Sequence, residues 1–476
     1  MGVVRGESAC RETKSVIDGP VPVVLASWAV GTVVMFAARP GRDAALVAMI
    51  AGWALLPNAD YPASAFAPPV GSGGSFHALA VPTGVLFNKA LSIGLGCLFG
   101  LILFDWPSVR RARPCWLDLP AAVWCLTPIA SALVNGLGPA WGLSQSRYLA
   151  LAWGVPYLLG RIYLGDNESL RRWGIGLALG GLAYVPLCLA EVVARPFLYG
   201  VVYGPQPYQN EGEARPLGFR PVVFQEHGNQ LGLWVALAAV ASVWLWRSGR
   251  LRAVAGIPGG WVASGLVGLC LVCQSLGAVA LAAAALAALP LLRSRGDLGP
   301  SRAAPVLAVA AVLAVAVAAG VLAMGTSGGL RQALRGAFSS AGKVSFTWRM
   351  ARYEDNLRRA AERPILGRGR ADWSNASDGT FVNPVNLGLW FHALGMFGAV
   401  GLVASTAVFA GPVIEVARWL PARAWLNPGC SAVTLAAALL LVSLADSLLN
   451  STVVLPVLAG AGGVNSWAVR RWGDDP

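Results

Sequence analysis

Arginines recur at helical spacing between residues 346 and 363. The stretch lacks glycine and ends before Pro364, which predicts a helix over about residues 346–362. On a helix its arginines would share an arc of roughly 80°. Their planar guanidinium groups would form a stripe suited to phosphate oxygens, whereas a solvated face or contacts with anionic lipid headgroups is the alternative. The stripe comprises Arg349, Arg352, Asn356, Arg359 and Arg363.

A second set of polar side chains directly precedes an apolar stretch that begins near Gln230. It contains Arg215, Arg220, Glu226 and His227. A histidine or a carboxylate at the boundary between water and an apolar helix can accept a proton near neutral pH, so both are candidate general bases. The alternative for His227 is a cap on the helix that follows. The residue types alone leave both roles open.

The rest of the chain has the composition of a membrane protein. Only 12% of its residues are charged and 56% are hydrophobic, and the mean hydropathy is +0.60. Apolar stretches long enough to cross a bilayer recur along the whole chain. The sequence predicts an all-α, polytopic integral membrane protein with about 12–13 transmembrane helices, in a single membrane domain over residues 1–476. The predicted spans are 21–38, 44–56, 84–104, 119–134, 148–160, 174–193, 230–246, 261–273, 276–292, 305–324, 385–410, 432–449 and 453–469.

The net charge of +13 is explained by membrane topology rather than by binding of nucleic acid. Lys and Arg concentrate in short cytoplasmic loops, and Arg-rich short loops alternate here with loops of little positive charge. This alternation predicts a cytoplasmic C-terminus and places the two longest loops, residues 195–229 and 325–384, together on the non-cytoplasmic face. The preference for positive charge in cytoplasmic loops does not explain the arginines of these two outer loops, whereas binding of an anionic ligand would explain them. Thirteen spans would put the N-terminus outside, although its own basic residues favour the inside.

The order of these residues resembles that of the O-antigen ligase and O-antigen polymerase family, bacterial polytopic membrane glycosyltransferases of the C superfamily. The first loop reads Arg220-x6-His-Gly-Asn-x-Leu-Gly, which is similar to the family's Arg-then-Pro-Asn motif. In the second loop, Arg349 is followed at similar spacing by Tyr353, Ala360, Pro364 and Gly367-x-Gly369. The resemblance covers roughly residues 119–412, and it extends to Ser275-x-Gly277-Ala278 and Asp378-Gly379.

The resemblance implies transfer or polymerisation of a glycan carried on undecaprenyl diphosphate, at the periplasmic face of the bacterial inner membrane, in O-antigen or exopolysaccharide assembly. The reaction would invert the anomeric centre and would need no metal and no other cofactor. The partners would be the lipid-linked glycan and a glycan or lipid acceptor. By motif position, the diphosphate would be held by Arg220 and Arg349, with Arg215, Arg352, Arg359 and Arg363 in support. The candidates for the base are Asp378, His227 and Glu226.

Two departures from the family pattern bear on the reaction. The ligases carry a histidine after the Gly-x-Gly, whereas residues 370–391 contain none here. The Ser-Arg-Gly of many members is Ser-Leu-Gly at Ser275. These departures leave the base unassigned and favour a polymerase or an unassigned relative over a lipid A ligase.

The competing functions are a transporter or lipid flippase and a non-catalytic partner of an exopolysaccharide complex. Transporters place ionisable groups within their spans, whereas the predicted spans here are nearly free of charge, with Glu191 and Asp446 near span ends. The resemblance also argues against a metal site. Metal-dependent members of the same superfamily carry paired acidic residues in the loop that corresponds to residues 57–83. That stretch contains only Asp60.

Overall fold

A computed structural model describes residues 19–62, 85–205, 214–294, 336, 359–370, 388–421, 424–448, 450 and 452–473. Over these residues the chain is mostly helical, as predicted, and its strands form two short antiparallel hairpins. Five of the described helical segments are long and apolar enough to cross a membrane. They are Val21–Ala38, Trp116–Val134, Asn167–Ala194, Gly228–Arg247 and Leu389–Trp419. This is the architecture expected of a multi-pass membrane protein.

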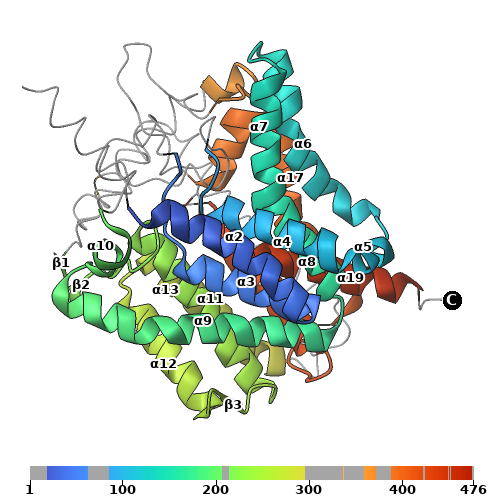
Figure 1. Ribbon diagram of the computed structural model, residues 1–476. Coiled ribbons are helices and arrows are strands. Elements are labelled where there is room, and N and C mark those ends of the chain that lie inside the picture. Colours follow the sequence, from blue (N-terminus) through green and yellow to red (C-terminus); the bar gives the residue numbers. More distant parts are fainter. Residues whose placement is uncertain are drawn as a thin grey trace, which may run out of the picture.

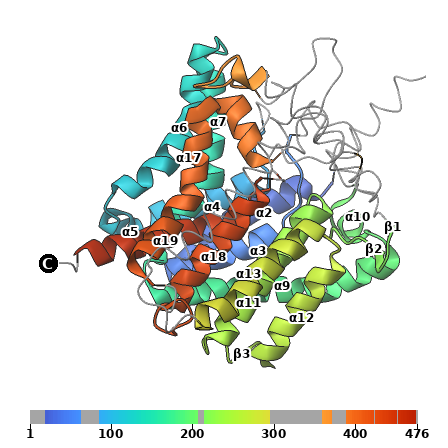
Figure 2. The same cartoon turned by 180° about the vertical axis from the view of Figure 1, so that it is seen from behind.

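The helices pack together in the bundle shown in Figures 1 and 2. The first half contains α2 (Val21–Ala38), α3 (Gly41–Leu55), α4 (Lys89–Phe104), α5 (Trp106–Arg111), η2 (Trp116–Asp118), α6 (Leu119–Val134), α7 (Pro139–Leu149), η3 (Ala150–Gly154), α8 (Val155–Tyr163), α9 (Asn167–Ala194) and α10 (Leu198–Tyr203). The second half contains β1 (Ala214–Arg215), β2 (Gly218–Phe219), α11 (Gly228–Arg247), β3 (Ala253–Val254), β4 (Ile257–Pro258), α12 (Gly259–Val272), α13 (Leu276–Ser294), α17 (Leu389–Trp419), α18 (Ser431–Asp446) and α19 (Leu455–Gly473).

Helix α11 is the most deeply buried of the five long apolar segments. Its sequence is apolar on every side, which is typical of a helix enclosed by other helices, and 89% of its most apolar stretch is buried. Helices α9, α12, α13 and α18 all contact it. The polar residues that directly precede α11 are therefore held at one end of the protein's core.

The structure moves several predicted span boundaries, among them the end of the span 385–410, since α17 continues to Trp419. Two of the differences have a local cause. Helix α9 begins at Asn167 rather than at residue 174, because the Asp166 side chain accepts a hydrogen bond from the backbone N–H of Ser169 at 2.8 Å and so caps the helix ahead of its apolar part. The predicted span 148–160 lies within a longer helical run, α7–η3–α8. That run contains the π-helical turn Ala150–Gly154, which ends two residues before Pro156, a residue with no N–H to continue the α-helical pattern.

Helices α8 and α19 approach each other closely at two glycines. A Cβ atom on Gly160 would overlap the carbonyl oxygen of Ala459, and a Cβ atom on Gly462 would overlap that of Tyr157. Small residues allow such backbone contact between membrane helices, where dispersion contacts stabilise the association. This pair connects the C-terminal helix to the middle of the chain.

We predict that Gly462→Leu destabilises the protein by roughly 1–3 kcal/mol, because the added side chain has no space against the α8 backbone. Thermal unfolding in detergent micelles measures the effect. Gly265→Leu on α12 is the matched control, since a Cβ atom there meets no atom within 4 Å. Equal melting temperatures for the two variants would contradict the close packing of α8 on α19.

Candidate functional site

The candidate site is built around a non-helical stretch, residues 220–227, which we call the junction segment. Residues 221–226 are buried although they form no regular secondary structure. Backbone N–H and C=O groups buried away from water must find partners. Side chains from three other parts of the chain supply these partners, and in doing so they form the site.

Glu191 supplies the acceptors for the N–H groups of the junction segment. It lies at the C-terminal end of α9 and is only 1% exposed. Its Oε2 accepts hydrogen bonds from the backbone N–H groups of Val222 at 2.9 Å and Val223 at 2.7 Å. Its Oε1 accepts from those of Phe197 at 3.2 Å and Leu198 at 3.1 Å. One carboxylate therefore ties α10 to the junction segment, and it helps to hold Val223 at a φ of +52°, which is rare for a β-branched residue.

Lys89 supplies a donor for a carbonyl group of the same segment. Its Nζ donates to the carbonyl oxygens of Phe224 at 3.1 Å and Trp53 at 3.0 Å, and it lies 5.2 Å from the centre of the Trp53 ring. Asn58 also donates to the Phe224 carbonyl, at 3.1 Å. Lys89 is 5% exposed. Sequence reasoning missed it, although a cation at a helix N-terminus opposes the helix dipole and so signals some other role.

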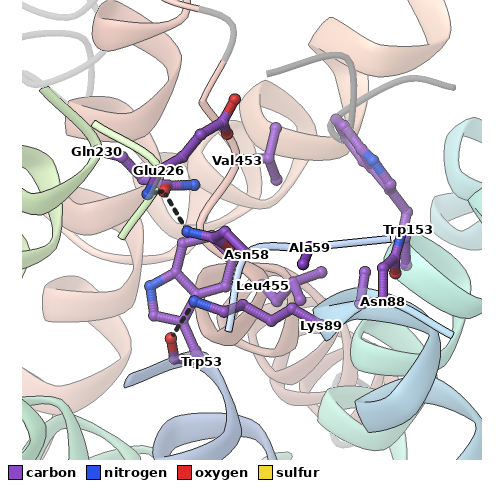
Figure 3. A pocket seen from close by; sticks show the side chains of 12 residues that line it. Trp53, Asn58, Ala59, Asn88, Lys89, Trp153, Glu226, Gln230, Val453 and Leu455 are labelled. Atoms are coloured by element: carbon purple, nitrogen blue, oxygen red, sulfur yellow. Dashed lines mark hydrogen bonds between the residues drawn. The ribbon is translucent and has the colours of Figure 1, made fainter. Parts of the chain in front are cut away.

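A cavity of about 530 Å³ of empty space, part of it open to solvent, lies beside Lys89. Its polar lining comes from Asn58, Asn88, Lys89, Glu226 and Gln230. Figure 3 shows Glu226 and Gln230 on one side of the opening and Trp153 with Asn88 on the other. We call this cavity the lysine pocket.

Glu226, one of the three predicted candidates for the base, lies in the lysine pocket. It is 2% exposed, and its carboxylate interacts electrostatically with the Lys89 ammonium. Its backbone N–H donates to Gln230 Oε1 at 2.7 Å. Asn58 Nδ2 lies 3.4 Å from the same oxygen. The position of Glu226 in the pocket is therefore set by its own backbone contact with α11.

Arg220 lies against the opposite side of the same helix start. Its Nη2 donates to Asn229 Oδ1, which also accepts from Ser275 Oγ at 3.4 Å. A Cβ atom on Gly228 would overlap the Arg220 side chain, and one on Gly232 would overlap Ser275. The structure therefore brings together the two family-like segments around Arg220 and Ser275, and it explains why glycine is needed at both motif positions.

His227 caps α11. Its Nδ1 accepts hydrogen bonds from the backbone N–H groups of Asn229 at 3.2 Å and Gln230 at 3.1 Å. When Nδ1 accepts in this way, the neutral ring carries its proton on Nε2, which leaves no lone pair for abstracting another proton. Of the two roles left open by the sequence, this geometry favours the cap.

Arg215 lies on the β1–β2 hairpin, at the same end of the protein as the junction segment. Its side chain is exposed. The tip of the hairpin reaches the turn between α12 and α13, where the backbone N–H of Leu217 donates to Gln274 Oε1 at 3.2 Å. Figure 1 shows this hairpin beside α10, at the end of α9 that carries Glu191.

Residues 364–370, which contain the Gly367-x-Gly369 motif, form a strap across a break in α17. The break is at Gly398, which has φ 65° and ψ −160°. The N–H groups of Ala399 and Gly369 donate to the carbonyl oxygens of Pro364 at 2.7 Å and Met396 at 2.8 Å, respectively. Figures 1 and 2 show this part of the chain beside α7 and α17.

The strap also accepts hydrogen bonds from side chains of α6, of its C-cap and of α7. Ser131 Oγ donates to the Leu366 carbonyl at 2.6 Å, and Asn135 Nδ2 donates to that of Gly367 at 2.8 Å. Trp141 Nε1 donates to the carbonyl of Gly369 at 2.9 Å. The Gly-x-Gly motif thus anchors the second long loop to the helices.

The arginine stripe is only partly described. Residues 359–361 are helical, as predicted, with Arg359 partly buried and Arg363 exposed just before the strap. The remaining predicted site residues lie outside the described residues; they are Arg349, Arg352 and Asp378. The predicted meeting of Arg220 with Arg349 at one diphosphate therefore stays a prediction.

Comparison with known proteins adds no further information about this site. No protein-family model matches the chain, and no curated protein matches it. The function is therefore inferred from the sequence motifs and from the geometry of the site. Among the described residues, no group of three or more His, Cys, Asp and Glu side chains could hold a metal ion.

We predict that Glu191→Gln destabilises the protein by about 1–3 kcal/mol, because the amide nitrogen would face backbone N–H groups that now donate to an oxygen. Hydrogen exchange should become faster at the amides of Val222 and Val223. The control is Glu362→Gln, which removes the charge of a largely exposed acid paired with Arg368. Unchanged exchange at both valines in Glu191→Gln would show that the carboxylate does not order the junction segment.

Proposed function

We propose that this protein is a glycosyltransferase of the bacterial inner membrane. It transfers or polymerises a glycan carried on undecaprenyl diphosphate, at the periplasmic face, in the assembly of a surface polysaccharide such as O-antigen or exopolysaccharide. The observation that carries the proposal is the arrangement at the start of α11. Arg220 lies against Gly228 on one side, and the buried carboxylate of Glu226 faces the lysine pocket on the other.

The charge distribution supports this orientation in the membrane. Helices α9 and α11 each have one end at the site and the other end in an Arg-rich region. At that far end Glu168 accepts from Arg171 at 2.6 Å and Arg250 at 2.7 Å. Arginines gather on the cytoplasmic side of membrane proteins. The site end is then periplasmic. The last turns of α19 lie at the Arg-rich end, where Arg470 lies against Gly165, so the C-terminus of a single membrane domain with about 12–13 spans is then cytoplasmic.

In the proposed reaction, one side of the α11 start accepts a proton and the other side stabilises the leaving diphosphate. An acceptor hydroxyl attacks the anomeric carbon of the donor sugar, and the bond from that carbon to the diphosphate oxygen breaks with inversion. Glu226 takes the proton of the attacking hydroxyl. Negative charge grows on the leaving diphosphate, and the Arg220 guanidinium stabilises it where it develops. The leaving group departs as undecaprenyl diphosphate, and no metal or other cofactor takes part.

Glu226 is our preferred base among the three candidates. It is a buried carboxylate that lines the lysine pocket. His227 uses Nδ1 to cap α11. Asp378 is the alternative base, placed by its motif position in the second loop.

One observation favours transport as the second candidate function. Lys89 and Glu226 are ionisable groups buried within a helical bundle, and such groups often mark substrate pathways in transporters. Purified protein incubated with lipid-diphosphate glycan separates the two functions. A transferase yields elongated glycan and released carrier lipid, whereas a transporter or flippase moves the substrate across a vesicle membrane without changing its mass.

We predict that Arg220→Ala and Arg349→Ala each lower glycan product by roughly a hundredfold or more, because each removes a cation from the developing charge on the diphosphate. Product is measured by mass spectrometry with purified, folded protein. Arg252→Ala is the matched control, since Arg252 is exposed near the β3–β4 hairpin, beyond the C-terminal end of α11. Product at the level of the unmodified protein from either Arg220→Ala or Arg349→Ala would refute the diphosphate site.

We predict that Glu226→Gln lowers turnover by roughly a hundredfold or more while binding of undecaprenyl diphosphate persists. His227→Asn should retain most activity, because asparagine caps a helix but cannot act as a base. Asp378→Asn tests the alternative base. Normal turnover in Glu226→Gln together with its loss in Asp378→Asn would transfer the role to Asp378.

A further inference from the structure

The lysine pocket has a chemical character different from that of the Arg220 side of the site. None of the described residues that line it is an arginine, and one of them is the carboxylate of Glu226. A diphosphate placed there would meet that negative charge at close range. The single cation, Lys89, already directs two of its three N–H groups to the carbonyls of Trp53 and Phe224. The pocket therefore suits an uncharged group with several hydroxyls.

The amide side chains of the pocket are held in fixed orientations. Asn88 donates to Asp60 Oδ1 at 3.2 Å and accepts from the backbone N–H of Leu91 at 2.9 Å. Gln230 Oε1 accepts from the backbone N–H of Glu226 at 2.7 Å. Amides and carboxylates together offer both donors and acceptors to the hydroxyls of a sugar. Because these groups are already ordered, binding a sugar ring there costs little additional side-chain entropy.

Two tryptophans give the pocket an apolar surface. Trp153 comes from the π-helical turn Ala150–Gly154, and Figure 3 shows it opposite Gln230. A π-helical turn inserts an extra residue into a helix and is found often at functional sites. Trp53 lies beneath Lys89. Lys89 covers the face of Trp53, so Trp153 is the ring that suits the C–H face of a sugar.

We propose that the lysine pocket binds the terminal, uncharged sugar of the acceptor. This proposal rests on the glycosyltransferase function proposed above and adds where the acceptor lies. Glu226 and Gln230 face the pocket, whereas Gly228 and Asn229 contact Arg220. The acceptor hydroxyl and the donor diphosphate therefore approach the start of α11 from its two sides, and Glu226 lies on the acceptor side to receive the proton.

Filling the pocket tests the proposal without removing a charge. Val453→Phe and Ala59→Phe each add bulk from the cavity wall, where these residues are 9% and 5% exposed. Val201→Phe is the matched control, because Val201 on α10 is 76% exposed and does not line the cavity. The protein is held in nanodiscs, and each variant is first shown to keep the melting temperature of the unmodified protein within a few degrees. The two filling variants come from different segments, so one that unfolds is replaced by the other.

The binding probe is the carrier-free glycan that mild acid releases from the native host's lipid-linked pool. Saturation-transfer difference NMR detects its ring protons even when binding is weak. We expect a signal with the unmodified protein, Val201→Phe and Arg220→Ala, and a fall to roughly one tenth in the pocket-filling variants. No signal with the unmodified protein, or an equal signal in both filling variants, overturns the acceptor subsite.

A second probe separates this proposal from the glycosyltransferase function. Binding of undecaprenyl diphosphate, followed by native mass spectrometry, should be lost in Arg220→Ala and kept in Val453→Phe. If the carrier lipid does not bind and no glycan is transferred, the glycosyltransferase proposal fails, whatever the NMR result. If the lipid binds and glycan is transferred but pocket filling changes neither sugar binding nor product, the acceptor lies elsewhere and the enzyme proposal stands.

Discussion

The structure depends on satisfying the backbone of a short irregular stretch at the end of an apolar bundle. Residues 221–226 are buried without regular secondary structure, so they lack the repeating backbone hydrogen bonds that a helix or a sheet supplies. In a membrane protein such backbone is tolerated only where protein or a wet cavity surrounds it. Glu191 takes the N–H groups of Val222 and Val223, while Lys89 and Asn58 take the carbonyl of Phe224.

The same constraint explains why the site is polar. The side chains that hydrogen-bond to the backbone of Val222, Val223 and Phe224 are charged groups or amides, drawn from α9, from the start of α4 and from the stretch after α3. Once these groups surround the segment, a cavity between them has donors and acceptors on its walls. Gln225 continues the pattern, because its amide nitrogen donates to Trp53 O at 3.2 Å and to the Tyr184 hydroxyl at 3.0 Å. Structural support and the chemistry of the site therefore come from the same residues.

Much of this could be predicted from the sequence, for reasons that differ between elements. Apolar length alone located α2 and α6, whose bounds match the predicted spans 21–38 and 119–134. The family-like pattern contains Arg220, Asn229 and Ser275, and in the structure Arg220 and Ser275 both hydrogen-bond to Asn229. Hydropathy could not show where α9 begins, because its start is set by the Asp166 cap. Hydropathy also could not reveal the role of Lys89. Its side chain bonds to the carbonyl of Phe224, which lies 135 residues away along the chain.

The candidate bases show the limit of residue types. The sequence placed a cap and a base on equal terms for His227, and only the positions of two backbone N–H groups relative to Nδ1 distinguish them. The sequence does not favour Glu226 over Asp378 or His227, because it does not reveal that the Glu226 carboxylate interacts with the Lys89 ammonium. The arginine stripe lies mainly outside the described residues, so the pairing of the two long loops stays a prediction.

The strap over α17 has a consequence for how such a protein diverges. It is attached largely through main-chain atoms: the carbonyls of Pro364, Leu366, Gly367 and Gly369 all accept hydrogen bonds from neighbouring helices or their ends. Because the strap is held through its own carbonyl groups, its attachment does not depend on the identity of most of its side chains. Substitutions at residues 365 and 368 leave its register intact, whereas Gly367, Gly369 and Gly398 have positive φ and must remain glycine. Substrate preference can therefore drift in the loop that follows while the attachment point is inherited unchanged.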